Sequence, residues 1–239
     1  MLKAVFFDLD GTLLPMNEKD FIQGYFGYLY KKVEKLGYEK EKLIDTIWKG
    51  TYMMVKNDGS KTNEEVFWNL FASVYGREKL KDKPIFDDFY KNEFKNAKSF
   101  CKENPLAKEI VEFCKTNVQY TILSTNPFFP RIGQQTRLSF INLKDTDFDY
   151  VTDYSNSSFC KPNPKYFQSL LDKFSLKPEE VILFGNNAVE DGDCSYSVGI
   201  KTYMVKGFII DDGKAKHTYE NIGMDQIIPT IKKEIENRK

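Results

Sequence analysis

The chain contains a short apolar segment, residues 3–7, that stops at a cluster of acidic and turn-forming residues. Residues 4–7 read AVFF, without a polar side chain, which is typical of a strand buried on both faces of a sheet. Periodicity alone also allows a helix over so short a run. If the segment is a strand, both of its faces must be covered by other elements, and Asp8 and Asp10 stand directly at its carboxyl end.

From residue 104 onward, predicted strands alternate with predicted helices. Strands are predicted at 118–124, 149–153, 181–184 and 201–205, and helices at 105–115, 164–174, 188–198 and 225–239, the last bent or begun near Pro229. Such alternation implies crossover connections and a parallel sheet. We therefore predict an α/β fold, with a Rossmann-like parallel sheet, for residues 1–14 and 104–239.

Residues 15–103 have a different pattern. Apolar side chains recur every three or four positions, first around Phe21, Tyr25, Leu29 and Val33 and again in two later segments, with Gly37 as a predicted helix stop. The pattern predicts an inserted all-helical cap domain. Its aromatic side chains are explained by the core of that domain as well as by a binding site.

Composition excludes several classes of protein. Lys and Arg number 35, as do Asp and Glu, and this balance argues against a nucleic-acid-binding surface. The apolar runs are far shorter than the ~18–20 residues that span a membrane, and residues 2–7 are too short for a signal peptide. Four widely spaced cysteines indicate reduced thiols in a cytoplasmic protein. His217 is the only histidine, which argues against sites and triads that need several.

Polar residues that could act in catalysis or bind a ligand follow the predicted strands. They are Asp8 and Asp10, then Thr125 and Asn126, then Lys161, and finally Glu190 and Asp191. Each alone has an ordinary explanation as a turn, a helix cap or a solvated surface charge. Because the carboxyl ends of parallel strands form the ligand crevice of an open sheet, their common placement favours one site. A divalent cation such as Mg²⁺ would relieve the repulsion between neighbouring carboxylates.

This order of motifs resembles the haloacid dehalogenase-like hydrolase superfamily. Residues 8–12 read DLDGT, a full match to its first motif, and Thr125 matches the second. Lys161, within KPNPKYF at 161–167, matches the third. Residues 185–191 match the acidic fourth motif with one departure, because an acid that the family usually has falls on Asn187. The insertion has the position of the family's helical cap.

The resemblance implies a Mg²⁺-dependent phosphatase with an aspartyl-phosphate intermediate. Asp8 would be the nucleophile, Asp10 the general acid and base, and Lys161 the cation that neutralises the transferred phosphoryl group. The phosphate ligands implied are Gly11, Thr12, Thr125, Asn126 and Lys161. The metal ligands implied are Asp8, Asp10 through its backbone carbonyl, and Asp191, with Asn187 as a further candidate.

Asp10 separates reactions within the family, because the dehalogenase branch needs no proton donor and usually has another residue there. A phosphosugar mutase keeps this acid and remains an alternative, as does a non-catalytic binding or regulatory protein on the same fold. The expected substrate is a small phosphorylated metabolite, without a nucleic-acid or membrane partner. Neither the identity of the substrate nor the oligomeric state can be inferred from the sequence.

Overall fold

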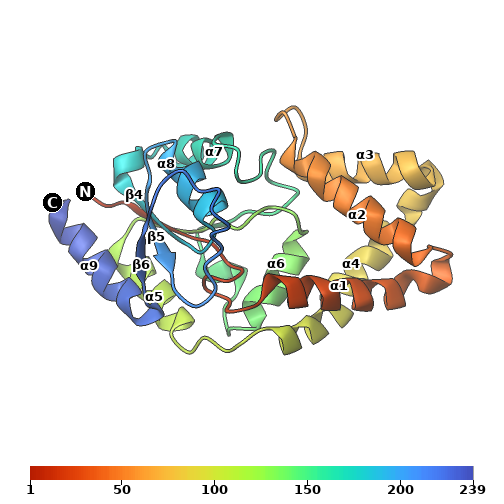
Figure 1. Ribbon diagram of the computed structural model, residues 1–239, viewed down its shortest axis with the longest axis horizontal. Helices are drawn as coiled ribbons and strands as arrows, with labels where there is room; N and C mark the ends of the chain where they lie inside the picture. Colours follow the sequence, from red (N-terminus) through yellow and green to blue (C-terminus); the bar gives the residue numbers. More distant parts are fainter. Residues whose placement is uncertain (239) are drawn as a thin grey trace.

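The computed structural model describes residues 1–238, and in this part of the chain it contains a parallel sheet of six strands (Figure 1). The strand order is β3-β2-β1-β4-β5-β6. The strands are β1 (Ala4–Phe7), β2 (Tyr120–Leu123), β3 (Tyr150–Val151), β4 (Val181–Gly185), β5 (Lys201–Val205) and β6 (Glu220–Ile222). Phe7 pairs in register with Leu123 and Phe184, so the residues that follow β1, β2 and β4 meet at one edge. The predicted α/β fold with a parallel sheet is confirmed.

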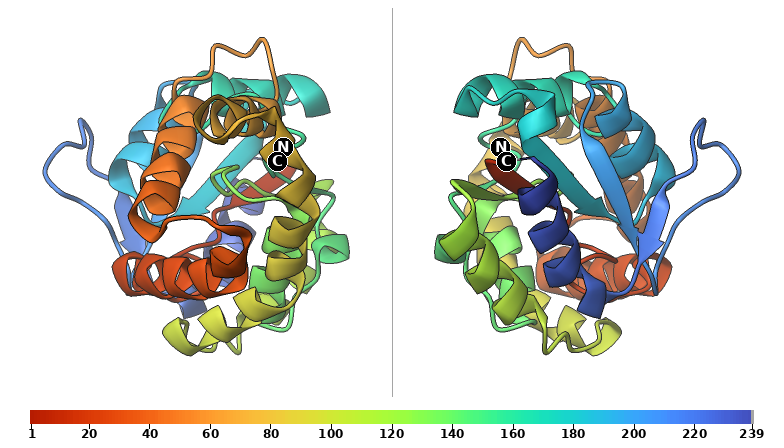
Figure 2. Two further views of the ribbon diagram at one scale, coloured as in Figure 1. Left: turned by 90° about the vertical axis from the view of Figure 1, so that its right-hand side faces the viewer. Right: turned by 90° about the vertical axis from the view of Figure 1, so that its left-hand side faces the viewer.

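Helices cover both faces of the sheet (Figures 1 and 2). Phe6 packs with α7 (Lys165–Phe174) on one face, whereas Val5 and Phe7 belong to the cluster that includes α5 (Ala107–Asn117) and α9 (Ile227–Asn237). All four residues of β1 have no measurable exposure. Successive side chains of a strand point to opposite faces, so this double burial explains why the strand carries no polar residue.

The segment between β1 and α5 is helical throughout and lies beyond one end of the sheet (Figure 1). It consists of α1 (Glu18–Val33), α2 (Lys40–Val55), α3 (Asn63–Tyr75) and α4 (Lys83–Lys91), with 3-10 turns at Glu34–Leu36, Arg77–Asp82 and Glu93–Phe100. The predicted three-to-four spacing corresponds to the buried stripe Phe21, Tyr25, Leu29 and Val33 of α1. Gly37 ends the following turn in the left-handed conformation, with φ of 83°.

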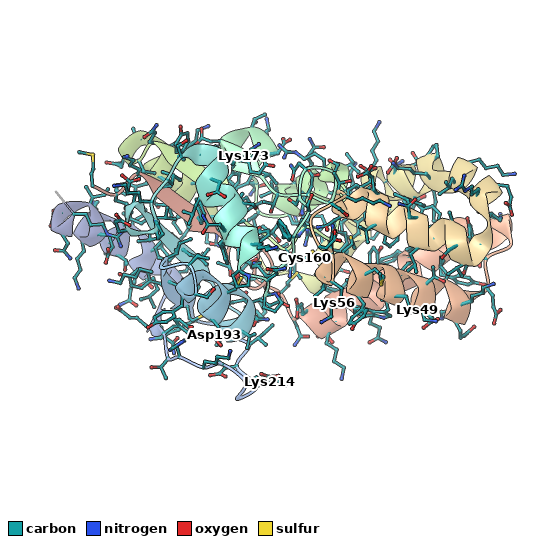
Figure 3. All side chains as sticks on the ribbon, turned by 90° about the horizontal axis from the view of Figure 1, so that it is seen from above. Lys49, Lys56, Cys160, Lys173, Asp193 and Lys214 are labelled. Atoms are coloured by element: carbon teal, nitrogen blue, oxygen red, sulfur yellow. The ribbon has the colours of Figure 1, made fainter. Side chains whose placement is uncertain are left out.

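The helical segment is attached to the sheet domain at several points. Met16 and Cys101 form an antiparallel bridge where the chain leaves and re-enters the sheet domain. The side chain of Asn63, at the start of α3, donates to Cys160 Sγ at 3.2 Å. Cys160 lies where the two parts meet (Figure 3). Thr136 Oγ1, on α6 (Arg131–Ser139), donates to the carbonyl of Tyr90 at 2.8 Å. The bridge lies near both ends of the predicted insertion, residues 15–103, whose boundaries stay a prediction.

Three elements differ from the sequence-based predictions. β6 was not predicted, because two of its three residues are exposed and polar. α6 was not predicted either, because its buried face carries Gln134 and Arg137 in place of an apolar stripe. The helix predicted at 188–198 is a π-helical turn over Ala188–Asp193 followed by α8 (Cys194–Tyr196). No helix in the described part of the chain is long and apolar enough to span a membrane.

Candidate active site

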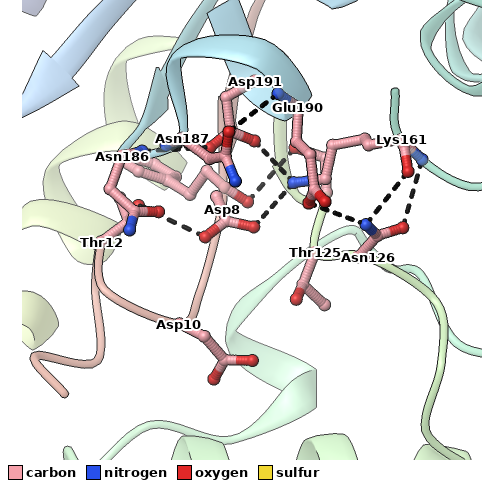
Figure 4. Close-up of polar contacts among 12 residues, drawn as sticks. Asp8, Asp10, Thr12, Thr125, Asn126, Lys161, Asn186, Asn187, Glu190 and Asp191 are labelled. Atoms are coloured by element: carbon pink, nitrogen blue, oxygen red, sulfur yellow. Dashed lines mark hydrogen bonds and ion pairs between the residues drawn. The ribbon is translucent and has the colours of Figure 1, made fainter. Parts of the chain in front are cut away.

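Two carboxylates share one buried ammonium group at the carboxyl edge of the sheet (Figure 4). Lys161 Nζ lies 2.7 Å from Asp8 Oδ1 and 2.6 Å from Asp191 Oδ1. Asp8 follows β1, Asp191 lies in the π-helical turn after β4, and Lys161 lies in the loop before α7. All three side chains are buried. The structure therefore brings together three of the residues that the sequence singled out.

Backbone and hydroxyl donors fix the orientation of both carboxylates. Asp191 Oδ2 accepts hydrogen bonds from the amides of Asn186 and Asn187, each at 3.0 Å. Thr12 Oγ1 donates to Asp8 Oδ2 at 3.3 Å, so Thr12 contacts the nucleophile candidate directly. A carboxylate held by such donors keeps one rotamer, and the gap between Asp8 and Asp191 is therefore defined.

The shared ammonium group dominates the electrostatics of this edge. Burial raises the pKa of Asp8 to about 8, and the charge of Lys161 opposes this shift. Burial alone would lower the pKa of Lys161, but the charges of Asp191 and Asp8 outweigh it and hold that pKa well above its usual value. Lys161 therefore stays charged, and Asp8 needs a further positive charge besides Lys161 to be an anion at neutral pH.

Asn126 and Glu190 form a second hydrogen-bonded group beside this cluster. Asn126 Nδ2 donates to Glu190 Oε2 at 2.9 Å, and Asn126 Oδ1 accepts from the Lys161 amide at 3.1 Å. Burial raises the pKa of Glu190 to about 7, with Lys161 opposing. The Asn126 side chain thus fixes the loop that carries Lys161. Thr125 is exposed by only 2% and lines the same cavity as Asp8.

Asp10 lies apart from the cluster around Lys161 (Figure 4). Its Oδ2 forms an ion pair with Arg137, a completely buried arginine of α6. The guanidinium group also stacks over the Phe129 ring at 4.3 Å from the centroid and donates to Gln134. Sequence reasoning missed Arg137, because a lone arginine on a helix without an apolar stripe is usually a surface residue. Asp10 Oδ1 is buried and has no hydrogen-bond partner among residues 1–238.

The side chain of Asn187, the further candidate for a metal ligand, is engaged as a helix cap. Its Oδ1 accepts from the amides of Val189 at 3.1 Å and Glu190 at 3.0 Å, as the N-cap of the π-helical turn. The amide that faces the Asp8 side is that of Asn186, whose Oδ1 accepts from Thr12 Oγ1 at 3.2 Å. The wide π-helical turn holds one more residue than an α-helical turn, which the spacing argument did not foresee.

Gly11 allows Asn186 to approach this closely. Gly11 has φ of 79°, and a Cβ atom there would overlap the Asn186 side-chain amide. Glycine is therefore required for both the backbone conformation and the space. The predicted phosphate-binding residues Gly11 and Thr12 thus form the turn beside Asp8.

Comparison with known proteins decides the family. The family described as haloacid dehalogenase-like hydrolase matches residues 5–205, which is most of the chain and includes every residue of the cluster. This chain belongs to the haloacid dehalogenase-like hydrolase family. The resemblance inferred from the motifs is thereby confirmed.

The relatives of this hydrolase are named for different activities. Glyceraldehyde 3-phosphate phosphatase of Pyrococcus furiosus is 26% identical over 214 residues, covering 86% of this chain and 81% of that protein. Mouse acyl-CoA dehydrogenase family member 10 is 30% identical over 104 residues, which are 44% of this chain but only 9% of that protein. The structure of 2-haloacid dehalogenase from Pseudomonas syringae pv. Tomato DC3000 has a TM-score of 0.63 at 16% identity, covering 98% and 99% of the two chains.

The donor set of this hydrolase fits a magnesium ion. Within residues 1–238, no group of three or more His, Cys, Asp or Glu side chains is placed to hold a metal. Mg²⁺, however, is usually held by one or two carboxylates together with water and substrate phosphate. Asp8 and Asp191 both lie within 3 Å of one ammonium nitrogen, so two oxygen donors already converge on a single cation. The backbone amide of Asn186 donates to Asp191 Oδ2, and Asp10 stands two residues after Asp8 in the chain.

Proposed function

We propose that this chain is a Mg²⁺-dependent phosphatase that hydrolyses a small phosphorylated metabolite through an aspartyl-phosphate on Asp8. The observation that carries the proposal is the sharing of Lys161 by Asp8 and Asp191 at the mouth of a cavity. A carboxylate that attacks a phosphate anion must be kept charged and must be shielded from repulsion, and Lys161 contributes to both needs. Mg²⁺, held by Asp8 and Asp191, would supply further positive charge.

The reaction proceeds in two steps on the residues of this chain. In the first step an Asp8 oxygen forms a bond to phosphorus, the bond from phosphorus to the leaving oxygen breaks, and Asp10 gives that oxygen a proton. In the second step Asp10 takes a proton from water, whose oxygen attacks phosphorus. This step releases inorganic phosphate and restores the Asp8 carboxylate. Lys161 and Thr125 bind phosphoryl oxygens throughout.

Arg137 gives Asp10 a fixed orientation for this role. The guanidinium group holds Oδ2, while the unpartnered Oδ1 remains for the leaving oxygen, and Asp10 lines the same cavity as Asp8. The presence of an acid at this position favours phosphate chemistry over dehalogenation, which needs no proton donor. We further propose that the helical segment 15–103 serves as a cap over this cavity.

The test is hydrolysis of p-nitrophenyl phosphate with Mg²⁺ by the purified chain and by Asp8→Asn. We expect turnover by the wild type and a loss of about 10³-fold or more in Asp8→Asn, because a covalent catalyst and its partners act as a unit. Asp45→Asn, which removes an exposed carboxylate of α2, is the matched control and should retain activity. Equal rates in Asp8→Asn and Asp45→Asn would reject the proposal.

A further inference from the structure

One cavity is lined both by Asp8 and by residues of the helical segment, and its lining is polar at one end and apolar at the other. Its volume is about 320 Å³. At the sheet edge its lining is polar, with Asp8, Thr125 and Lys161. At the helical end the lining is mainly aromatic, and it includes Phe21, Tyr25, Trp48, Phe67, Trp68 and Phe86 from α1 to α4.

This aromatic lining is not explained by the core of the helical segment alone. Phe21 and Phe86 are buried and belong to that core, but Trp48 lines the cavity with 47% of its surface exposed. A large apolar side chain exposed at the wall of a cavity costs free energy unless another apolar group covers it. The wall is therefore suited to a ligand that supplies such a group.

The charged groups of the lining exclude a second anion. Among the described residues that line the cavity, Lys161 is the only basic one, and it already serves Asp8 and Asp191. The charges on the helical side are the carboxylates of Glu18 and Asp87. Burial raises the pKa of Glu18, with the carboxylates Asp10 and Asp191 adding to the shift and the cations Lys161 and Arg137 opposing it.

The same carboxylates do not form a strong cation site. Burial raises the pKa of Asp87, and Lys83 opposes that shift, so a lysine on the same helix partly offsets its charge. Lys83 in turn forms an ion pair with Glu64. The reaction proposed above makes no use of the aromatic wall.

We propose that the substrate is a phosphate monoester whose leaving group is an uncharged apolar group, either aryl or alkyl of several carbons. This inference rests on the proposed function for its reaction, and it specifies what the cavity selects. Each methylene buried against the wall contributes about 4-fold to kcat/KM, by the usual transfer free energy of a buried methylene. A carboxylate on the leaving group would instead face Glu18 without a cation to pair with.

The test compares ethyl, butyl and hexyl phosphate, 2-naphthyl phosphate, phosphoglycolate and phosphocholine under one set of conditions. We expect kcat/KM to rise about 4-fold per methylene from ethyl to hexyl phosphate. The naphthyl ester should lie at the high end, and phosphoglycolate should lie below ethyl phosphate. A flat alkyl series, or a preference for phosphoglycolate or phosphocholine, would overturn the inference.

A binding measurement separates this inference from the proposed function. Trp48 and Trp68 are the only tryptophans in the sequence, and both line the cavity, so intrinsic fluorescence reports on its occupation. Ethyl and hexyl phosphonate, which cannot be hydrolysed at phosphorus, should show the same dependence on chain length in their dissociation constants. This dependence without any phosphatase activity would support the apolar site and reject the phosphatase. Equal binding of both phosphonates would reject the apolar site.

Two variants test whether the dependence of kcat/KM on chain length comes from the aromatic lining of the cavity. Trp48→Ala should reduce the ratio of kcat/KM for hexyl over ethyl phosphate by several-fold, because it removes apolar surface from the cavity. Tyr52→Ala removes an exposed aromatic side chain of the same helix that does not line the cavity, and it should leave the ratio unchanged. An unchanged ratio in Trp48→Ala would contradict the inference.

Discussion

Replacing Lys161 by methionine should destabilise the fold in a way that depends on pH. Lys161 is about 1% exposed and contacts two buried carboxylates at 2.7 and 2.6 Å. Removing one partner of a buried ion pair typically costs about 3–5 kcal/mol, because the remaining charge stays buried without compensation. Methionine keeps a similar length and leaves no large cavity, so the missing charge is the main change.

The sign of the pH dependence follows from the raised pKa of Asp8. Burial raises the pKa of Asp8 to about 8 even though Lys161 opposes the shift, so Lys161→Met, which lacks that opposing charge, raises the pKa of folded Asp8 further. The free energy of unfolding of both proteins falls as the pH rises from the ordinary aspartate pKa. The wild type stops losing stability at its own Asp8 pKa, whereas the variant continues to lose it above that pH. For one group the slope is at most ~1.4 kcal/mol per pH unit. The deficit of Lys161→Met relative to the wild type should thus be larger at about pH 9 than at about pH 6.

Urea denaturation in EDTA at these two pH values measures the difference in free energy of unfolding between Lys161→Met and the wild type. Lys165→Met, an exposed lysine of α7, is the matched control and should change the free energy of unfolding by less than about 0.5 kcal/mol. A deficit for Lys161→Met below about 1 kcal/mol at about pH 9, or one equal at both pH values, would refute the reasoning about the shared ammonium group.

Three further changes test other parts of the site. Arg137→Met should cost about 3–5 kcal/mol of unfolding free energy, because Asp10 would lose its buried partner. Arg131→Met, at a pair with Asp145 whose side chains are 39% and 18% exposed, should cost less than Arg137→Met in the same urea assay. Asn187→Ala should cost about 0.5–2 kcal/mol as a lost N-cap, yet leave the Mg²⁺ concentration for half-maximal activity unchanged. Asp191→Asn should raise that concentration, and EDTA should abolish turnover reversibly.

The sequence was most informative where one local signal agreed with the tertiary structure. The apolar run before Asp8 forms the doubly buried strand that its composition favoured, and its register with β2 and β4 places Asp8, Thr125 and Asp191 at one edge. Lys161 was found because its motif precedes a helix with a clear apolar stripe, α7.

What the sequence could not show depends on packing between distant segments. Arg137 has no local signature, since its burial results from Asp10 and Phe129, which lie elsewhere in the chain. The capping contacts of Asn187 result from a π-helical turn, whose extra residue changes every spacing argument across it. The aromatic residues of the helical segment also could not be divided in advance, because a buried core and a cavity wall produce the same apolar periodicity.

The central claim is that Asp8 becomes phosphorylated during turnover. The most direct measurement is mass spectrometry of the protein after acid quenching in the steady state with p-nitrophenyl phosphate and Mg²⁺, followed by digestion. The account predicts one additional phosphoryl group on the peptide that contains Asp8, and no such group in Asp8→Asn. Turnover with the phosphoryl group on another peptide, or on none under conditions where a burst of product shows that an intermediate accumulates, would contradict it.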